Sequence, residues 1–574
     1  MIWVLAVFFP LFLVCLILIP RLPSRLYPAA CALGGIPALA LGLLGADLQP
    51  VQIETILLGA HLGFGEFGRP FLLLTSLVWT GAGLFSAWSM RSDSGQGKFT
   101  IFFLLAMCGN IGLTVAQDII TFYLFFALMT FSAYVLVVHN GTEKAGRAGN
   151  IYLIMAVIGE GLITAGLMLA AFMGESILLP EIAQALSYLP QHHPMFWMLF
   201  VGFGIKAGVL LLHFWLPLAH PVAPTPASAV LSGAMIKAGL LGWMHFFPLG
   251  LAQFELWGSL FIILGLLGAF FGVLAGLMEK DPKTVLAYSS VSQMGLMTFL
   301  CGLALFEPRL WGAALPGLIM FATHHGLAKA SLFLGVAVSR TIQAKSLMRP
   351  VFTAALTLPA LTLAGFTFTS GSRIKYLMKD MVSAGPWPDL TLFLLYMSSL
   401  ATTLLMAHFI CRIRASAEPG QKSSLSGQIW VWAALIGLVA LLPWLLQNVY
   451  PGLPEHSWLD PGFIQGSVWP VLLGGAVFLW LRNRDIFGKS LLDKWPDMAE
   501  VMEKAWRRAY ARWQASWLCD PDCVQINFVH LADRFIYSRP GILVPCIGEA
   551  RFRSWLVIGA SLVFLALLLA WLAI

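Results

Sequence analysis

Two lysines lie in a stretch of the sequence that is otherwise almost entirely apolar. Residues 204–239 read GIKAGVLLLHFWLPLAHPVAPTPASAVLSGAMIKAG, and Lys206 and Lys237 stand near its two ends. A charged side chain at the centre of a bilayer costs about 2.5–3.5 kcal/mol on insertion scales, so such residues normally face a protein interior or a hydrated cavity. Because burial penalises the charged form, a lysine in this setting can release and take up a proton. The two lysines therefore indicate proton transfer.

Histidines accompany the buried lysines at helical spacing. His213 follows Lys206 by seven residues, which places both side chains on one face of a continuous helix. In the second half of the chain, the run FATHHGLAKASLFLG contains His324, His325 and Lys329, with His325 one turn before the lysine. These histidines are candidate partners of the lysines in proton transfer.

Prolines and glycines interrupt the lysine-bearing segments. Four prolines follow Lys206 between residues 217 and 226, and a proline inside a helix breaks it and frees a backbone carbonyl. The run LPALTLAGFTFTSGSRIKYLM likewise combines a proline and two glycines with Lys375. Two halves that each contain a broken, lysine-bearing helix are typical of transporters built from repeats.

The composition predicts an all-α, polytopic membrane protein. Of the 574 residues, 59% are hydrophobic and only 11% are charged, whereas soluble domains carry about 25% charged residues. A membrane-spanning helix needs about 20 apolar residues, and about sixteen stretches qualify. They are 1–20, 27–45, 70–90, 100–116, 119–138, 150–172, 196–215, 225–247, 254–278, 284–304, 311–338, 351–379, 389–411, 428–448, 468–481 and 554–574.

The distribution of Lys and Arg predicts the orientation of the chain. If the N-terminus faces outward, 26 of the 34 basic residues lie in inner loops, two lie in outer loops and six lie within spans. Cytoplasmic loops carry such an excess, so we expect a periplasmic N-terminus in a bacterial inner membrane. The basic residues are scattered over many loops, which argues for contact with the lipid bilayer and against a nucleic-acid partner.

The segment 482–553 is the only long polar region. Within it, Met502, Trp506, Ala509, Trp513 and Trp517 recur at helical spacing, and basic residues lie off that stripe. This pattern predicts a basic amphipathic helix on the inner membrane surface. A helix that packs on the bundle, or one that clamps a partner subunit, is the alternative.

The sequence offers little for metal or cofactor binding. Cys519 and Cys523 form CDPDC, but no further ligands cluster with them, so we expect neither a metal site nor a cofactor. Iron–sulfur and nucleotide-binding patterns are also missing. We therefore assign no enzymatic activity to the chain itself, and any redox chemistry would belong to partner subunits.

Three motifs in order resemble those of a known family. The runs HFWLPLAHPVAPTPASAVLSGAMIKAG, KDPKTVLAYSSVSQMG and HGLAKASLFLG are similar to stretches of the antiporter-like membrane subunits. Such subunits occur in respiratory complex I, in Mrp-type cation/proton antiporters and in membrane-bound hydrogenases. The resemblance covers roughly residues 70–415 and implies fourteen core helices, two inverted five-helix repeats and a row of ionisable residues that relays protons.

The resemblance also implies a division of the chain and a role for each matching residue. By motif position, Lys206 resembles the central lysine of the first half-channel, Lys237 the connecting lysine, His325 with Lys329 the connecting pair of the second half, and Lys375 its terminal lysine. The expected parts are N-terminal helices in 1–99, repeats in 100–247 and 254–411, core helices in 412–481, the amphipathic segment in 482–553 and a final membrane helix in 554–574.

Two positions depart from the family pattern. The family usually has a glutamate next to the first lysine, where this chain has Ala127. Glu160, in VIGEGLITAG, is the only carboxylate deep in the spans of the first half, so we hypothesise that it takes that role. Many relatives also have a histidine where this chain has Phe321, and His324 is the candidate to replace it.

We therefore expect a proton-translocating membrane subunit of a multisubunit complex, with sodium as an alternative coupling ion. Other membrane subunits would be its partners. Two other functions remain open: a non-conducting scaffold that holds a partner enzyme through 482–553, and the membrane half of a two-part inorganic-carbon pump. The scaffold predicts that Lys206 and Lys375 tolerate replacement, and the carbon pump predicts a soluble zinc-enzyme partner.

Overall fold

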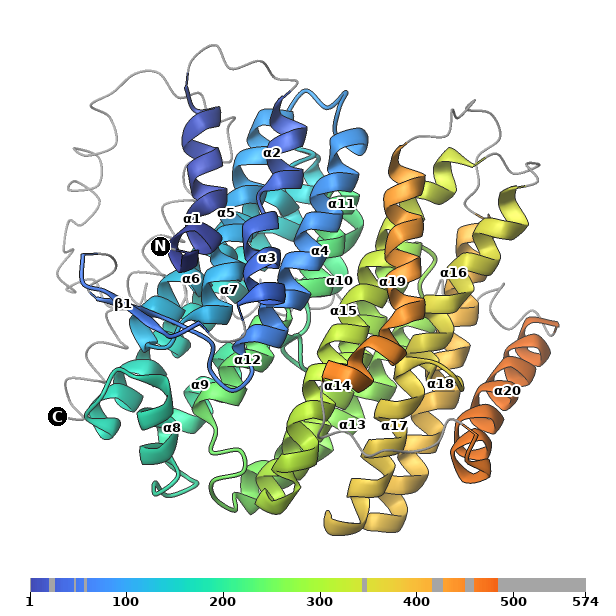
Figure 1. Cartoon of the computed structure of the whole chain (residues 1–574). Coiled ribbons are helices and arrows are strands. Elements are labelled where there is room, and N and C mark those ends of the chain that lie inside the picture. The colour runs from blue at the N-terminus through green and yellow to red at the C-terminus, as the bar shows by residue number, and fades with distance from the viewer. Residues whose placement is uncertain are drawn as a thin grey trace, which may run out of the picture. The chain divides into compact units, whose positions relative to one another are not determined.

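The computed structural model describes residues 2–19, 26–45, 48–55, 59–342, 348–415, 427–449 and 459–483, all within one compact unit of the chain. In these residues the fold is predominantly helical (Figure 1), which confirms the predicted class of membrane protein. The amphipathic helix predicted in 482–553 and the final span at 554–574 lie outside the described residues, apart from 482–483.

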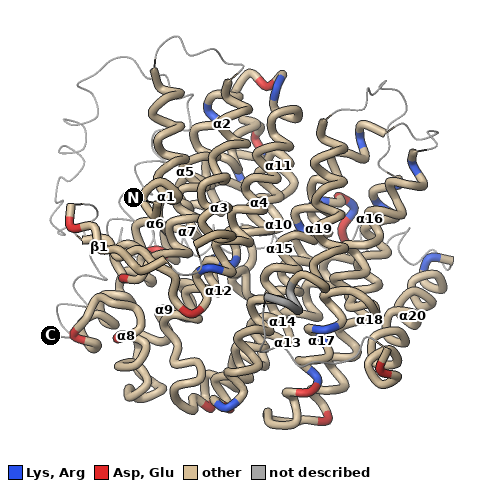
Figure 2. Tube along the Cα trace, in the orientation of Figure 1, with Lys and Arg blue, Asp and Glu red and all other residues tan. Residues whose placement is uncertain are grey.

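Ten helices in the described part of the chain are long and apolar enough to cross a membrane, by length and composition. The expected count of sixteen spans is not confirmed, because four further apolar helices are shorter than 18 residues. Figure 2 shows how few charged residues the helices carry, and large apolar side chains such as Leu267 and Leu274 of α13 (Glu255–Leu277) are exposed, as lipid contact requires.

The first part of the chain leads into two successive sets of helices. The leading elements are α1 (Ile2–Ile17), α2 (Tyr27–Leu33), α3 (Ile36–Leu44), β1 (Val51–Ile53), β2 (Ala60–Leu62) and α4 (Gly68–Ser89). The first set contains α5 (Gln96–Val115), α6 (Ile119–Val137), α7 (Glu143–Gly174), α8 (Leu179–Leu186), α9 (Pro194–Ala207), α10 (Trp215–Val222), α11 (Thr225–Val230), the π-helix η2 (Leu231–Met235) and α12 (Lys237–Phe246).

The second set and the closing helices follow. The second set contains α13 (Glu255–Leu277), α14 (Pro282–Phe306), η3 (Pro308–Leu310), α15 (Trp311–Thr341), α16 (Met348–Ala364), α17 (Ser370–Met381), η4 (Val382–Ala384) and α18 (Pro388–Ala415); α19 (Gly427–Val449) and α20 (Pro461–Asn483) come after it. If α8 is set aside, each set has five successive spans, and the fourth span of each is broken. The relation of the two sets by inversion stays a prediction.

The first break begins at a glycine rather than at a proline. Helix α9 ends at Ala207, where Gly208 has φ +71° and Leu211 then has φ +73°. The indole nitrogen of Trp215 donates a 2.8 Å hydrogen bond to the Ile205 carbonyl, which no longer accepts from Val209 because that N–H donates to Gly204 instead. The prediction that Lys206 and His213 share one face of a continuous helix is therefore wrong, since they lie on either side of the break.

The second break separates α16 from α17 and confirms the predicted interruption before Lys375. Gly365 has φ +81° and Phe368 has φ +60°, both in the left-handed region. A Cβ atom at Gly371 would collide with the Thr362 carbonyl oxygen. Glycine at 371 therefore lets the start of α17 lie directly against the end of α16.

Helix α15 packs at the centre of the bundle and joins the two sets. It contacts α4, α11 and η2 on one side and α14, α16, α17 and α19 on the other. The most apolar part of 225–246 is completely buried. In α20, by contrast, only 28% of the corresponding part is buried. The segment that carries Lys237 is thus screened from lipid by the surrounding helices, and α20 lies at the edge beside α17 and α18 (Figure 1).

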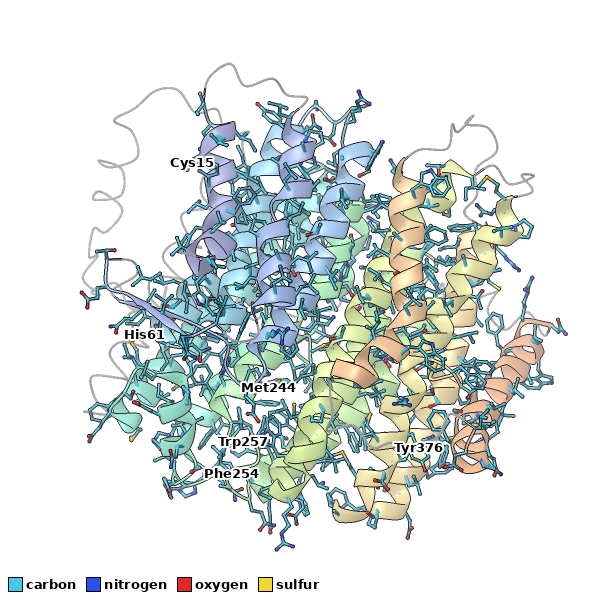
Figure 3. The ribbon with its side chains drawn as sticks, viewed as in Figure 1. Cys15, His61, Met244, Phe254, Trp257 and Tyr376 are labelled. Carbon is cyan, nitrogen blue, oxygen red and sulfur yellow. The ribbon has the colours of Figure 1, made fainter. Side chains whose placement is uncertain are left out.

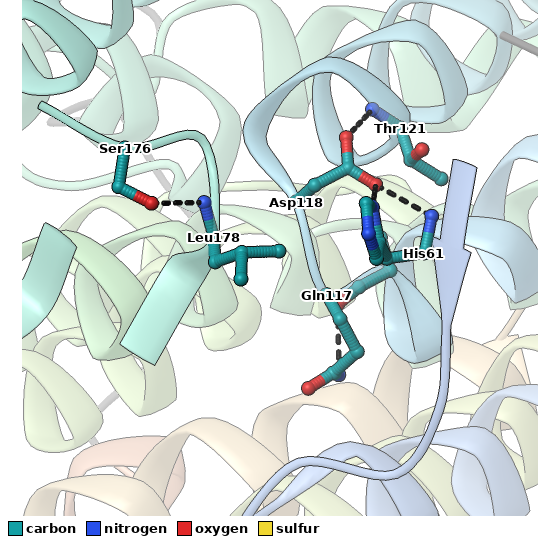
Figure 4. Close-up of polar contacts among 7 residues, drawn as sticks. His61, Gln117, Asp118, Thr121, Ser176 and Leu178 are labelled. Atoms are coloured by element: carbon teal, nitrogen blue, oxygen red, sulfur yellow. Dashed lines mark hydrogen bonds and ion pairs between the residues drawn. The ribbon is translucent and has the colours of Figure 1, made fainter. Parts of the chain in front are cut away.

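A short antiparallel hairpin, β1–β2, is the only strand pair in the described residues and was not predicted. It pairs Val51 with Leu62, and buried Asp118 fastens it to the start of α6 (Figure 4). The Asp118 carboxylate accepts hydrogen bonds from the backbone N–H groups of Thr121, at 2.7 Å, and His61, at 2.8 Å. One carboxylate therefore caps a helix and pins the hairpin.

Candidate functional site

Lys206 is buried in the last turn of α9 and is held by two hydroxyl groups. Its Nζ atom donates to Thr130 Oγ1 of α6 at 3.0 Å and to the Tyr152 hydroxyl of α7 at 3.5 Å. It also lies 5.6 Å from the ring centroid of Phe126. The lysine therefore has polar contacts from both neighbouring helices, together with the favourable position of a cation at a helix C-terminus.

Glu160 lies beside Lys206 in a small shared cavity. Both residues line a cavity of about 20 Å³, together with Thr130, Tyr152 and Trp215. In the part of the chain that the structure describes, neither carboxylate oxygen of Glu160 has a hydrogen-bond partner. A water molecule needs about 10–15 Å³ of such space, so the cavity is large enough for one. Its accessible lining is apolar, so the structure places Glu160 near Lys206 without a direct ion pair between them.

Close packing of α7 against α9 brings this pair together. A Cβ atom at Gly202 would lie 2.7 Å from Ile163 Cγ1 and 3.1 Å from the Gly159 carbonyl oxygen. Glycine at 202, one turn before Lys206, therefore lets α9 approach α7 beside Glu160. The half-buried Ala127 of α6 offers no polar atom to the site, and Thr130, one turn later on the same helix, supplies a hydroxyl instead.

Lys237 and His325 form a direct contact between the two sets of helices. The Nζ atom of Lys237 lies 2.8 Å from His325 Nδ1 and donates to the Ser232 carbonyl at 2.7 Å. Both side chains are almost completely buried. Lys237 follows directly after the π-helix, whose wider turn is marked by a hydrogen bond from Ile236 N to Leu231 O. No ion pair among the described residues involves this lysine.

A pair of serines connects the Lys237 region to Lys329. Ser232 Oγ lies 2.7 Å from Ser290 Oγ of α14, which donates to the Leu286 carbonyl at 3.0 Å. Lys329 Nζ donates to the same carbonyl at 2.8 Å. Because Ser290 gives its one proton to Leu286, Ser232 must be the donor between the two serines. This serine bridge therefore fixes α14 between the two lysines.

His324 lies on α15 toward Lys375, next to His325 in sequence. Its ring is 5.4 Å from that of Phe321, and the charges of both Lys375 and Lys237 act on it. Lys375 Nζ donates at 3.0 Å to the Ala364 carbonyl, which the second break has freed. The charge of the connecting lysine thus acts on both adjacent histidines of α15, and that of the terminal lysine acts on His324.

His213 lies in the first break and faces the second set of helices. Its buried ring is 5.1 Å from Phe271 of α13 and 6.3 Å from Tyr288 of α14. The structure therefore separates it from the direction in which Lys206 points, which is toward Thr130 and Tyr152. Of the predicted residues, Lys237, His324, His325, Lys329 and Lys375 gather around α15, while Lys206 and Glu160 form a second cluster.

The hydroxyl groups of these clusters were not predicted from the sequence, whereas His220 is one of the histidines that the apolar runs contain. No sequence motif identifies the hydroxyl groups that contact the lysines or connect them. Their position within apolar helices is the only signal in the sequence for Thr130, Tyr152, Ser232 and Ser290. His220 of α10 is fully buried, stacks on Phe333 at 4.5 Å and faces the charges of Lys283 and Lys329. Among the described residues, neither of its ring nitrogens has a hydrogen-bond partner.

The chain belongs to a family of transmembrane subunits. The family described as NADH:quinone oxidoreductase/Mrp antiporter, transmembrane, matches residues 116–410, slightly more than half of the chain. Among curated proteins, the chain is similar to hydrogenase-4 component B of Escherichia coli strain K12, with 31% identity over 341 residues, or 53% of this chain and 49% of that protein. It is also 30% identical to a putative antiporter subunit mnhA2 of Staphylococcus epidermidis over 358 residues, or 58% of this chain and 43% of that protein.

Two solved structures share the fold. A chain of the Mrp complex from Dietzia sp. DQ12-45-1b matches with a TM-score of 0.74 at 20% identity, over 96% of this chain and 65% of that one. A chain of the membrane-bound sulfane sulfur reductase, an archaeal respiratory membrane complex, matches with a TM-score of 0.66 at 17% identity, over 83% of this chain and 99% of that one. The present chain spans less than half the length of the two curated relatives above.

The shared cavity predicts an energetic coupling between Glu160 and Lys206. Replacing one of them leaves the other as a buried charge without compensation. We expect Glu160→Gln and Lys206→Met to be non-additive, with a coupling free energy of about 0.5–3 kcal/mol. Denaturant-induced unfolding of the purified chain in detergent micelles would measure it. Lys144→Met, at an exposed position of α7, combined with Glu160→Gln gives the control pair, whose effects on unfolding free energy should add. If the effects of Glu160→Gln and Lys206→Met add as well, the expected coupling is contradicted.

Proposed function

We propose that this chain translocates protons across a bacterial inner membrane as one subunit of a multisubunit complex. The observation that carries the proposal is the buried contact between Lys237 and His325, 2.8 Å apart, with Lys329 one turn further along the same helix. A lysine and an imidazole at this distance can exchange a proton directly. Lys237 has no carboxylate partner among the described residues. This favours a state in which only one of Lys237 and His325 is protonated and the other is neutral and can accept the proton.

His325 is the proton carrier between the two lysines in this proposal. The serine bridge ends on the Ser232 and Leu286 carbonyls, which accept hydrogen bonds and do not release protons. It therefore positions Lys237 and Lys329 without conducting. The second nitrogen of His325, Nε2, has no hydrogen-bond partner in the described residues and can receive or deliver the next proton.

The two clusters form the proposed relay in the order in which the helices place them. Glu160 and Lys206 take up a proton in the first set, Lys237 and His325 connect the sets, and Lys329, His324 and Lys375 continue toward the second break. A charge that moves onto one of these groups changes the proton affinity of its neighbours, because Coulomb interactions are strong in a low-dielectric interior. His213 is assigned to the break between α9 and α10.

The names of similar proteins support a multisubunit setting. One relative is a hydrogenase component, another is a putative antiporter subunit, and both fold neighbours are chains of membrane complexes. The division into parts, the periplasmic N-terminus and the inner-membrane location stay predictions, supported by the excess of basic residues in the predicted inner loops.

The partners of the chain should identify the complex. We expect that a tag on the full chain captures further membrane subunits from mild-detergent extracts, because the relatives are complex subunits. Mass spectrometry of the captured complex would distinguish hydrogenase or quinone-reductase subunits from small Mrp-type subunits. Capture of a soluble zinc enzyme would instead favour the inorganic-carbon pump, and a chain that purifies alone would contradict the proposal.

Removal of the lysine at the junction of the two sets should stop transport. In liposomes that contain the captured complex, we expect Lys237→Met to lower potential-driven proton uptake by about 100-fold, since a positioned proton carrier typically contributes 10²–10⁴-fold. A pH-sensitive dye inside the liposomes gives the rate, with and without a sodium gradient. Lys98→Met, on the exposed start of α5, is the matched control. Full transport by Lys237→Met would favour the scaffold.

Glu160 should replace the carboxylate that is missing at Ala127. We expect Glu160→Gln to reduce proton transport by at least about tenfold, because it removes the titratable group beside Lys206 while keeping the side-chain volume. Glu160→Asp should retain part of the rate. Glu143→Gln, at the exposed start of the same helix, should transport normally. Wild-type rates in Glu160→Gln and Glu160→Ala would rule out this substitution of roles.

A further inference from the structure

A fifth lysine, Lys379, lies one turn after Lys375 in the last turn of α17. Its Nζ atom donates to the Gly466 carbonyl of α20 at 2.9 Å and lies 3.8 Å from the ring centroid of Tyr396 on α18. Tyr376, labelled in Figure 3, lies on the same helix and packs its ring 5.3 Å from that of Phe463 of α20. Lys379 is therefore half-buried where α17, α18 and α20 meet.

These contacts form a binding site for an ammonium group. An aromatic face attracts a cation, a carbonyl oxygen accepts its hydrogen bond, and the C-terminal end of a helix stabilises positive charge. Lys375 has only the Ala364 carbonyl as its hydrogen-bond acceptor among the described residues. Lys379 thus has two groups that stabilise its ammonium form, a carbonyl oxygen and an aromatic ring, whereas Lys375 has one carbonyl oxygen.

The spacing of the two lysines couples their charges. Side chains four residues apart are neighbours on a helix, and like charges at this spacing repel. The charge of Lys379 acts on Lys375 in the structure. A proton on Lys379 therefore disfavours a second proton on Lys375.

We propose that Lys379 is the proton carrier that follows Lys375, an inference that rests on the proposed function. An N–H bond of the Lys375 ammonium breaks, and an N–H bond forms on the neutral amine of Lys379. Lys375 is then neutral and ready to receive the next proton from the side of His324. The Lys379 ammonium finally loses its proton to water at the membrane face where α17 ends, beyond Met381.

Helix α20 has a defined part in this step. It lies beyond residues 116–410, which match the family, and its Gly466 carbonyl is one of the two groups that hold Lys379. The alternative is that Lys379 only anchors α20 by extending its charged end toward the membrane surface. An anchor needs a permanent positive charge, whereas a carrier must also exist as a neutral amine, so the two roles respond differently to arginine.

The test compares Lys379→Arg with Lys379→Met in liposomes that contain the captured complex. Arginine keeps the cation, the ring contact and the carbonyl contact, but it does not deprotonate in proteins. We expect both variants to lower potential-driven proton transport by about 100-fold, as for other positioned proton carriers. Lys144→Arg and Lys144→Met, on an exposed turn of α7, are the matched controls. Wild-type transport by Lys379→Arg would show an anchor and overturn the proposal.

A histidine at the same position gives a second, independent measurement. Lys379→His keeps a titratable nitrogen with a model-peptide pKa of about 6.5 instead of about 10.4. We expect it to transport, with a pH profile shifted to lower pH. The ionisable groups that surround the site are Lys375, Tyr376 and Asp380 on α17, Tyr396 on α18 and Asp460 before α20. An unshifted profile would contradict the proposal, whereas a wild-type complex that transports no protons would refute the proposed function instead.

Discussion

The burial of lysine amines without carboxylate partners is the constraint on which the rest of the structure depends. Lys237 and Lys329 are almost fully buried, and their contacts are a histidine nitrogen and backbone carbonyls rather than acidic groups. A carbonyl oxygen in a regular helix can accept a second hydrogen bond, as Leu286 does, and an interruption of the helix frees further carbonyls. The π-helix before Lys237 and the break before Lys375 are therefore part of the way in which the chain accommodates the lysines.

The two halves solve this problem with different partners. In the first set, Lys206 has hydroxyl groups, an aromatic ring and a nearby carboxylate around a water-sized cavity. In the second set, Lys375 uses the Ala364 carbonyl, which the break between α16 and α17 has freed. Between them, α15 carries His324, His325 and Lys329 and contacts helices of both sets. Glu160 lines the same cavity as Lys206 from the neighbouring helix α7, and the proposed function assigns it the role of the carboxylate that is missing at Ala127.

The sequence predicted what depends on composition and on residue type. Apolar stretches located the helices, because exposing them to water is costly. Lysines within these stretches located the polar clusters, because a charged side chain is costly to bury without polar partners. It did not predict the start of the first break, since Gly208 ends α9 before the prolines are reached. It also placed Lys206 and His213 on one face, an error that follows directly from that break. Hydroxyl partners such as Tyr152 and Ser290 depend on how helices meet, which the order of residues alone does not specify.

The adjacent histidines of α15 point in directions that differ by about 100° around the helix axis, because an α-helix has 3.6 residues per turn. His325 contacts Lys237, and His324 lies toward Lys375. A rotation of α15 about its own axis moves both rings together, so it can bring one ring toward its lysine while taking the other away. In the proposed relay, such an alternation would keep the two contacts from forming at the same instant, and protons would not run freely back down their gradient.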